Sequence, residues 1–409
     1  MKAMSDYPRL RGGLEATPID HENQTMILIS DRLGVSRAPL VLSPVAAGLL
    51  GMMDGGHSLR DLQAHLMRTT GRMVFMEELQ GIVQTLDENL FLDNERFRDA
   101  LARRVAQFRE DGVRRMKFAG SAYPAEAAAL RAKLDSFFPV EAGGPGLPFQ
   151  AAPQEKLLGL VAPHIDINAG GPCFAHAYKV LTESIVPETW VILGTGHEPL
   201  ENHFALTLKD FETPLGLVRC DGELAGELAR KVPRDILASE YNHAREHTVE
   251  FQAVFLAHLQ PVARIIPLLC SFSLEDAEND RGYIDEVSRI LGGLAEHGER
   301  SVGFMASVDL AHIGPRYGDR FRPTRATVSE HVEADAKLLD LLVRTDADGF
   351  MRRVVREGNR RRICGVAPLY VLARILAGKA RGRLLHHAHA LVDAQGSFVT
   401  FASMAFHAL

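Results

Sequence analysis

Four short segments of this chain carry side chains that could meet and do chemistry. Three of them follow apolar runs that predict strands, and they hold His164, His197, and the pair Asp309 and His312. The fourth holds Cys364 between an isoleucine and a glycine. In open α/β sheets, ligands and catalytic groups gather where strands end. Two imidazoles, a thiolate and a carboxylate meeting there could hold a transition metal.

Each of these side chains also has a specific chemical use. Cys364 precedes a helix predicted over 365–377, and a helix N-terminus favours the thiolate. Asp309 and His312 are three residues apart, so on a helical turn they would face the same way. Asp309 could then orient a histidine or bind metal, and His312 could act as acid or base. Asp166, close to His164, could reach the same place. The competing interpretations are a buried inert thiol, a capping aspartate and surface side chains.

A second constellation competes with the first. His243, Glu246 and His247 form an H-x-x-E-H pattern, which on a helix would place two histidines for zinc with Glu246 as the base of a metallopeptidase. With 17 histidines in the chain, so short a match arises easily by chance. A later tract with three histidines could bind metal or form a solvated strand. Its histidines are His386, His387 and His389.

Basic and glycine-rich segments give weaker signals. A run of arginines before Cys364 could attract an anionic substrate or form a solvated helix face. It comprises Arg352, Arg353, Arg356, Arg360, Arg361 and Arg362. No P-loop is present, and Gly194–Gly196 lacks the third glycine of a dinucleotide fingerprint.

Composition points to a cytoplasmic protein. The 409 residues suggest two or three domains, and two is the favoured number. Hydrophobic residues make up 46% and charged residues 24%, with a net charge of −6. No nucleic-acid partner is expected, because there is no overall basic field. Four cysteines without a CxxC pair indicate reduced thiols. The start lacks a signal-peptide core, and the longest apolar stretch, 38–53, is too broken to span a membrane.

The N-terminal part predicts a small winged-helix-like α+β domain, residues 1–94. Residues 1–20 look unstructured. A strand at 26–29 precedes three helices that begin near Ser43, Ser58 and Met76, and 89–92 predicts a short closing strand. A connecting helix follows over 95–112, within a connecting segment taken as 95–116.

This domain resembles the PqqD-like peptide-binding domains of peptide-modifying systems. The stretches that carry the resemblance are Leu42–Gly55, Ser58–Leu62 and Leu86–Leu92. The resemblance implies capture of a leader peptide as an added strand. A docking domain or a winged helix without ligand stays open. DNA binding is disfavoured, because the second helix offers only Arg60 and Arg68 as cations.

From residue 157 onward, predicted strands alternate with helices, which indicates a sheet flanked by helices. The predicted strands are 157–161, 190–194, 204–208, 263–269, 302–308 and 398–406. The predicted helices are 172–183, 221–231, 247–259, 280–297, 327–344 and 365–377.

Residues 117–409 resemble the MEMO-like family, also called the AmmeMemoRadiSam system protein B group. The matching blocks occur in the family's order. They are Ala119–Pro124, Ala162–His164, Gly171–Lys179, Ile192–His197, Thr213–Gly216, Glu246–Glu250, Asp309–His312 and Ile363–Gly365. The resemblance implies a fold similar to class III extradiol dioxygenases.

The resemblance also implies a site. Metal binding falls to His164, His197 and Cys364, with Asp309 and His312 beside the metal and His312 as the acid/base. Fe(II) is the favoured metal, with Cu or Zn as alternatives. The chain departs from the family's motifs at three places. The family's P-H-A-G-Y reads P-H-I-D-I at Pro163–Ile167, so the glycine and the tyrosine are missing. Ile313 replaces the tryptophan of the family's H-W-G, and Val366 replaces an expected arginine. These changes alter the pocket wall.

Three hypotheses result. The first is a non-heme metal oxidoreductase, dioxygenase-like, acting on a peptide or a small aromatic substrate. The second is a non-catalytic metal- or peptide-binding adaptor, and the third is the H-x-x-E-H metallopeptidase. The expected partners are a peptide held by the N-terminal domain and a radical enzyme of the same system.

Overall fold

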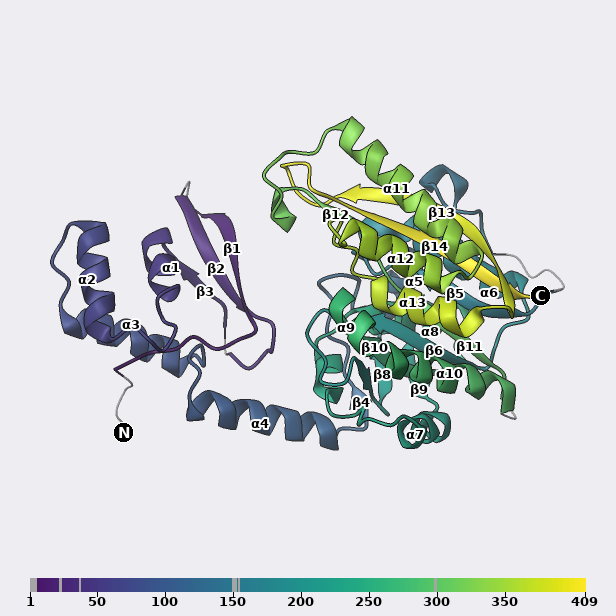
Figure 1. The fold of residues 1–409 in the computed structure, drawn as a ribbon, viewed down its shortest axis with the longest axis horizontal. Helices are drawn as coiled ribbons and strands as arrows, with labels where there is room; N and C mark the ends of the chain where they lie inside the picture. The colour runs from purple at the N-terminus through teal and green to yellow at the C-terminus, as the bar shows by residue number, and fades with distance from the viewer. Residues whose placement is uncertain (1–5, 22–23, 37, 149–152, 154, 298–299) are drawn as a thin grey trace. The chain divides into compact units, whose positions relative to one another are not determined.

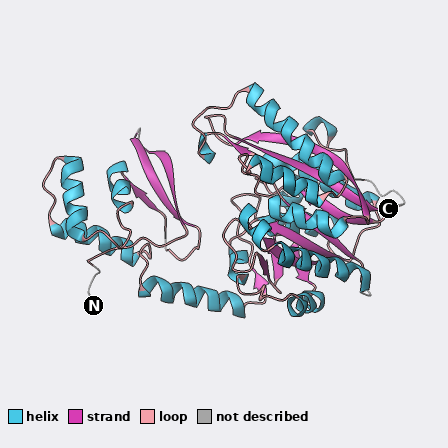
Figure 2. Cartoon of the chain, viewed as in Figure 1, coloured by secondary structure: helices cyan, strands magenta, loops and turns pink. Residues whose placement is uncertain are grey.

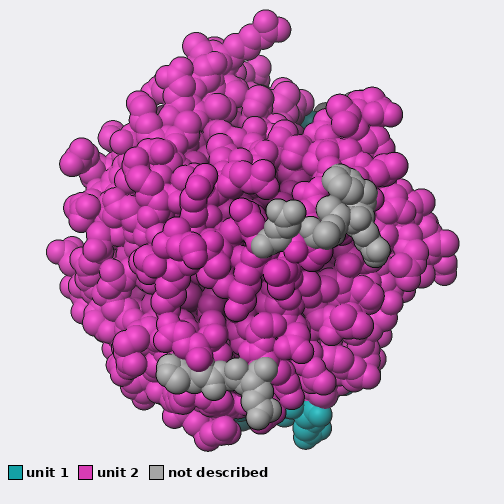
Figure 3. All heavy atoms as spheres, turned by 90° about the vertical axis from the view of Figure 1, so that its right-hand side faces the viewer, with its two compact units in different colours: residues 1–110 teal, residues 111–409 magenta. Residues whose placement is uncertain are grey.

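The chain folds into two compact units, unit 1 (Met1–Glu110) and unit 2 (Asp111–Leu409), which Figure 3 colours separately. A computed structural model describes residues 6–21, 24–36, 38–148, 153, 155–297 and 300–409. The first five residues, which belong to the start that is expected to lack a signal-peptide core, lie outside the described residues. None of the described helices is long and apolar enough to cross a membrane.

Unit 1 is a small antiparallel sheet followed by helices (Figure 1). In its described residues the elements are β1 (Leu14–His21), β2 (Gln24–Asp31), β3 (Leu40–Leu42), α1 (Pro44–Leu50), α2 (Leu59–Thr70), α3 (Met76–Glu88) and α4 (Glu95–Glu110). The three expected helices form where predicted. Ser43 and Ser58 cap α1 and α2, because each hydroxyl accepts an otherwise unpaired N–H of the first turn.

Two expectations for unit 1 are wrong. From Leu14 onward the supposedly unstructured start is β1, an edge strand paired along its length with β2; its polar side chains are tolerated because most face solvent. The closing strand at 89–92 does not form. Phe91 instead packs into the helical core, and Leu92 makes only a single bridge to Leu10. The sheet therefore precedes the helices, unlike the predicted winged-helix order.

The described strands of unit 2 form one mixed sheet in the order β12-β14-β5-β11-β6-β10-β9-β8-β4, with β13 paired to β14 and β7 to β10. The strands are β4 (Val113–Arg114), β5 (Leu157–Ala162), β6 (Thr189–Thr195), β7 (Phe204–Leu206), β8 (Asp210–Thr213), β9 (Gly216–Cys220), β10 (Arg264–Cys270), β11 (Val302–Ser307), β12 (His312–Ile313), β13 (Ala380–Leu391) and β14 (Phe398–Ala408). The centre is parallel: β11 pairs with β5 on one side and with β6 on the other, and β6 pairs with β10.

Helices cover both faces of this sheet (Figure 2). They are α5 (Ala127–Asp135), α6 (Ile167–Glu183), α7 (Gly222–Lys231), α8 (Thr248–Leu259), α9 (Leu274–Asn279), α10 (Arg281–His297), α11 (Arg325–Val343), α12 (Ala347–Glu357) and α13 (Val366–Leu376), with short 3-10 turns η1 (Val140–Ala142), η2 (Glu240–Ala244) and η3 (Pro315–Tyr317). Side chains of α5, α6 and α8 share one apolar core with one face of the central strands, and those of α7, α10, α11, α12 and α13 share another. The central strands are buried on both faces, as in α/β proteins.

Unit 2 follows the predicted alternation with local differences. The helix expected from residue 172 begins at Ile167, because the Asp166 side chain accepts the Asn168 N–H and caps it there. The expected strand 204–208 is shorter, as β7. The elements that were not predicted are β4, β8, β9, β12, β13, α5, α9 and α12. Several of these elements are half-exposed, so their apolar patterns are weak.

Candidate metal centre

Three neighbouring parallel strands end at one edge of the sheet, and each is followed by a side chain of the candidate site. His164 lies two residues after β5, His197 two after β6, and Asp309 two after β11, the strand between them. Since the carboxyl ends of parallel strands meet at one edge, these side chains converge although they are far apart in sequence. The rings of His164 and His197 lie edge to face with their centroids 5.1 Å apart.

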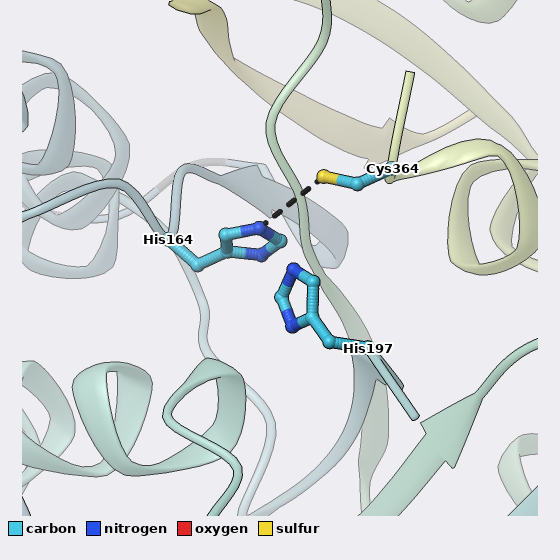
Figure 4. Close-up of side chains that lie close together, drawn as sticks. All are labelled: His164, His197 and Cys364. Atoms are coloured by element: carbon cyan, nitrogen blue, oxygen red, sulfur yellow. Dashed lines mark hydrogen bonds between the residues drawn. The ribbon is translucent and has the colours of Figure 1, made fainter. Parts of the chain in front are cut away.

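Cys364 reaches the same place from the loop between α12 and α13. The Gly365 N–H donates to the Asp309 carbonyl oxygen at 3.3 Å. A Cβ atom at Gly365 would lie 2.5 Å from the Val308 Cβ, so only glycine permits this approach. The Cys364 Sγ lies 3.3 Å from the His164 Nε2, and Figure 4 shows all three side chains pointing toward one another. One ligand atom from each of His164, His197 and Cys364 falls within 4.8 Å of the others.

Hydrogen bonds fix which ring nitrogen faces the centre. The His164 Nδ1 lies 3.0 Å from the Ser307 carbonyl oxygen, so it donates its proton there. The His197 Nδ1 lies 3.1 Å from the Glu246 carboxylate. Both Nε2 atoms are therefore left for the centre. An acceptor on the outer nitrogen of a histidine is the usual support of a metal-binding ring.

Glu246 and His247 have a role at this site that the sequence analysis did not assign. The Glu246 carboxylate accepts from the ring and backbone N–H of His197, and from the backbone N–H groups of His247 and Thr248. It also pairs with the His247 Nδ1 at 3.1 Å. With so many donors, it orients the rings and has little capacity left for an ion. The His247 ring stacks on His197, with centroids 5.1 Å apart.

Asp309 lies against the His164 ring. Its Oδ1 accepts the His164 backbone N–H at 3.1 Å, and its Oδ2 lies 3.6 Å from the His164 Nε2. Burial raises the pKa of Asp309 to about 7, against the opposing effect of the backbone N–H groups of His164 and Ile165. Its carboxyl group can therefore hold or release a proton near neutral pH.

His312 lies three residues after Asp309, but the segment between them is not the helical turn on which both side chains would face the same way. Leu310 and Ala311 donate to the main chain and side chain of Thr400, which pairs the segment with β14 instead of coiling it. The His312 Nδ1 donates to the Leu310 carbonyl oxygen at 3.0 Å, which leaves Nε2 available. Its ring meets Tyr317 edge to face. Burial lowers the pKa of His312, and a charged His197 lowers it further.

The pKa values of the three candidate ligands, His164, His197 and Cys364, are shifted in different directions. Burial and the neighbouring His197 and His247 rings hold the pKa of His164 well below its usual range, so His164 is neutral. Burial also disfavours a charged His197, but the Glu246 carboxylate outweighs it and raises the pKa well above normal. The expected depression of the Cys364 pKa is wrong for the metal-free chain. Burial raises the thiol pKa despite a hydrogen bond from His197.

The H-x-x-E-H pattern does not form the arrangement that a metallopeptidase needs. His243 belongs to the 3-10 turn η2, whereas α8 begins only at Thr248, so His243 and His247 are not one helical turn apart. The His243 side chain is buried, and its Nε2 bonds to the Ala205 carbonyl oxygen at 2.8 Å. Burial lowers its pKa to about 4. His243 is therefore a core side chain.

The three histidines of the later tract, His386, His387 and His389, each have different neighbours. The His386 ring stacks on His176, whereas the His387 Nε2 lies 3.5 Å from the Asp335 Oδ2 in α11. The ring of His389 meets Phe398. None of the three belongs to a group of potential metal ligands among the residues with described positions.

The arginine run is divided between core and surface. Arg361 is buried against Asp335, and its Nε donates to Glu357 at 3.1 Å. Arg362 pairs with Asp319. The remaining arginines lie on the exposed or half-exposed side of α12 and the turn after it.

A small cleft of about 90 Å³ opens on the sulfur side of the centre. Its walls come from the turn after β6, the segment from β10 into α9, and the start of α13. The lining residues are Gly196, Cys270, Ser271, Phe272, Ser273, Leu274, Asn359, Ile363, Cys364, Val366 and Ala367. A ligand could approach Cys364 through this cleft.

The donor set fits a transition metal. Imidazole nitrogens and a cysteine sulfur are typical ligands of Fe, Cu or Zn. Mg²⁺ and Ca²⁺ prefer oxygen ligands, so this set does not suit them. Three protein ligands with adjoining acid/base groups are also the composition of a catalytic centre, in contrast to the four ligands of a structural zinc site.

Comparison with known proteins finds a matching family model and several relatives of similar length. A family model described as "Memo-like protein" matches residues 114–405. A MEMO1 family protein of Aquifex aeolicus is 28% identical over 382 residues, 93% of this chain and 96% of the relative. Others, from Methanopyrus kandleri and Thermococcus kodakarensis, are 34% and 33% identical, covering 64% and 67% of this chain and 86% and 92% of the relatives. The Aquifex alignment is long enough to extend into unit 1.

Proposed function

The chain belongs to the Memo-like protein family, and from this premise we propose that it is a metal-dependent oxidoreductase of the extradiol-dioxygenase type. The observation that carries the proposal is the convergence of His164, His197 and Cys364, with the outer nitrogen of each ring already bonded elsewhere. Fe(II) is the metal that we favour, and Cu and Zn are the alternatives. When bound, such a metal supplies a Lewis acid and, if redox-active, an electron donor for dioxygen.

The residues around the centre support proton handling. His312 keeps its Nδ1 proton on the Leu310 carbonyl oxygen, so its Nε2 can accept a substrate proton as general base. The lowered pKa of His312 favours the neutral form that this role needs. Asp309 holds the His164 backbone in place and can exchange a proton near pH 7. The cleft beside Cys364 has room for a small ligand.

Metal analysis of anaerobically purified protein tests the first part of this proposal. The wild type is expected to bind one Fe(II) per chain. His164→Ala, His197→Ala and Cys364→Ala are expected to lose most of that metal. His243→Ala is the matched control, because it removes a nearby buried histidine without removing a ligand. Equal metal in all variants would refute the centre.

Oxygen uptake tests the second part. Iron-loaded protein is mixed with catechol-like compounds, and uptake is compared between the wild type and His312→Ala at equal iron content. Uptake that depends on His312 supports an oxidoreductase. Bound iron without uptake for any substrate class would instead favour the non-catalytic adaptor.

For unit 1 we propose capture of a peptide by strand addition. The support is the β1-β2-β3 sheet, whose outer strands β1 and β3 pair with no further strand in the described part of the chain. An edge strand offers unpaired backbone N–H and C=O groups to an extended peptide. Fluorescence anisotropy with a labelled precursor peptide encoded beside the gene tests this. Binding that survives Val41→Pro on β3 and Leu14→Pro on β1 would count against it.

A further inference from the structure

Arg114 is a cation buried at the start of unit 2. Its side chain lies in β4, four residues after the end of unit 1, and it is 0% exposed. A guanidinium group out of water is costly unless its donors are satisfied. Here it pairs with the Glu250 carboxylate, and its remaining donors go to main-chain carbonyl oxygens. Each of its three nitrogens therefore has at least one hydrogen-bond partner.

Two of the carbonyl oxygens that accept from Arg114 belong to the segment that runs from η2 to the start of α8. The Arg114 Nε donates to His243 at 3.0 Å, and its Nη2 donates to Glu246 at 2.9 Å. The side chain of Glu246 accepts from the His197 and His247 rings. Glu246 therefore connects Arg114 to His197: its backbone carbonyl oxygen accepts from the guanidinium group, and its side chain accepts from the His197 ring.

Glu250 fixes the second side of this arrangement. Its carboxylate accepts the backbone N–H groups of Lys117 and Phe118 and the Tyr123 hydroxyl. Phe118 in turn meets the His247 ring edge to face, with centroids 5.8 Å apart. The Arg114–Glu250 pair thus ties the segment after β4 to the segment that orients the histidines.

We propose that Arg114 is a positioning residue of the metal centre: by holding the main chain at His243 and Glu246, it fixes the Glu246 carboxylate and hence the His197 ring. The inference rests on the proposed function, because it concerns the affinity of that centre for metal. A lysine at this position would keep the charge, but it lacks the planar fork that reaches the carboxylate and both carbonyl oxygens together.

Cobalt(II) binding tests this inference without requiring activity. The probe is Co²⁺ alone, measured by chelator competition and by the visible absorption of a cobalt–thiolate centre. Arg114→Lys is expected to bind Co²⁺ at least about tenfold more weakly, the size typical for loss of support behind a ligand, and with an altered spectrum. The matched control is Asp221→Asn, which weakens the ion pair between the buried Asp221, directly after β9, and the partly exposed Arg300, and it should leave Co²⁺ affinity unchanged.

A double variant separates positioning from folding. Arg114→Met with Glu250→Gln removes both buried charges, so it is expected to fold even if Arg114→Lys does not. It should still bind Co²⁺ at least about tenfold more weakly than the wild type, since nothing then holds the two carbonyl oxygens. Wild-type affinity and spectrum in either folded variant would overturn the inference. Failure of the wild type to bind Co²⁺ would overturn the proposed centre itself, and this inference with it.

Discussion

The Cys364 Sγ lies 3.3 Å from the His164 Nε2, although 200 residues separate the two in the chain. The contact depends on β5, which ends beside β11, and on the Gly365 N–H, which docks the cysteine loop onto the turn after β11. A third ligand atom from His197 lies within 4.8 Å of both. The centre is thus shared by three segments that only the folded sheet brings together.

Glu246→Gln is expected to weaken metal binding about 10- to 100-fold while every ligand remains, because the amide cannot accept from all the donors that the carboxylate now satisfies. Chelator competition with Zn²⁺ gives the affinity. Glu240→Gln is the control and should match the wild type. It removes a carboxylate that accepts a hydrogen bond from Thr207 and contacts no candidate ligand. Equal affinities for all three proteins would show that the carboxylate does not support His197.

Asp309→Asn is expected to make the stability of the metal-free protein less sensitive to pH. The pKa of Asp309 is raised from 3.8 to about 7 in the fold, so the folded state favours the protonated carboxyl. The wild type therefore loses folding free energy as pH rises from about 4 to 7, by at most about 4 kcal/mol, and loses no more above that window.

Urea unfolding of chelator-treated protein at pH 4.5 and pH 8 (about the limits of the window) measures this difference. The advantage of Asp309→Asn over the wild type should be larger at the higher pH. Asp166→Asn, at an exposed helix cap, should show no such change. A difference that is the same at both values contradicts the assignment of Asp309 as a buried carboxyl with a raised pKa.

Gly365→Ala is expected to destabilise the protein by about 1–3 kcal/mol and to weaken metal binding, since the added Cβ would overlap Val308 and push the cysteine loop away. Thermal unfolding and metal affinity are measured together. Gly282→Ala in α10 is the control, because nothing lies within 4 Å of its Cβ position and alanine favours a helix. If both variants behaved alike, close packing at Gly365 would not be what positions Cys364.

Thiol alkylation of the folded metal-free protein is expected to modify Cys364 first, because Cys173, Cys220 and Cys270 are buried. Burial raises the Cys364 pKa, so the rate should keep rising with pH beyond the range of an ordinary thiol. Bound Zn²⁺ should protect this cysteine. Peptide mass spectrometry after iodoacetamide treatment locates the label, and uniform labelling of the four cysteines would contradict the structure.

The sequence alone determined which side chains could form the centre. Apolar runs that end just before His164, His197 and Asp309 predict parallel strands, and parallel strands carry their ends to one edge. That inference needs only local pattern and a general rule of topology. Local pattern likewise predicts the alternation of strands and helices in unit 2 and the three helices α1, α2 and α3 of unit 1, of which α1 and α2 have serine caps.

Only the tertiary structure decided how the centre is supported. The sequence leaves the segment from His243 to His247 free to be a helix, and Arg114, distant in sequence, holds it in a turn that aims Glu246 at His197. Half-exposed elements such as β1 and β13 have little apolar pattern, so pairing with β2 and β14 defines them. The raised pKa of Cys364 likewise follows from burial, which outweighs the hydrogen bond from His197. Desolvation depends on all the atoms packed around the sulfur, and many of these belong to residues distant in the chain.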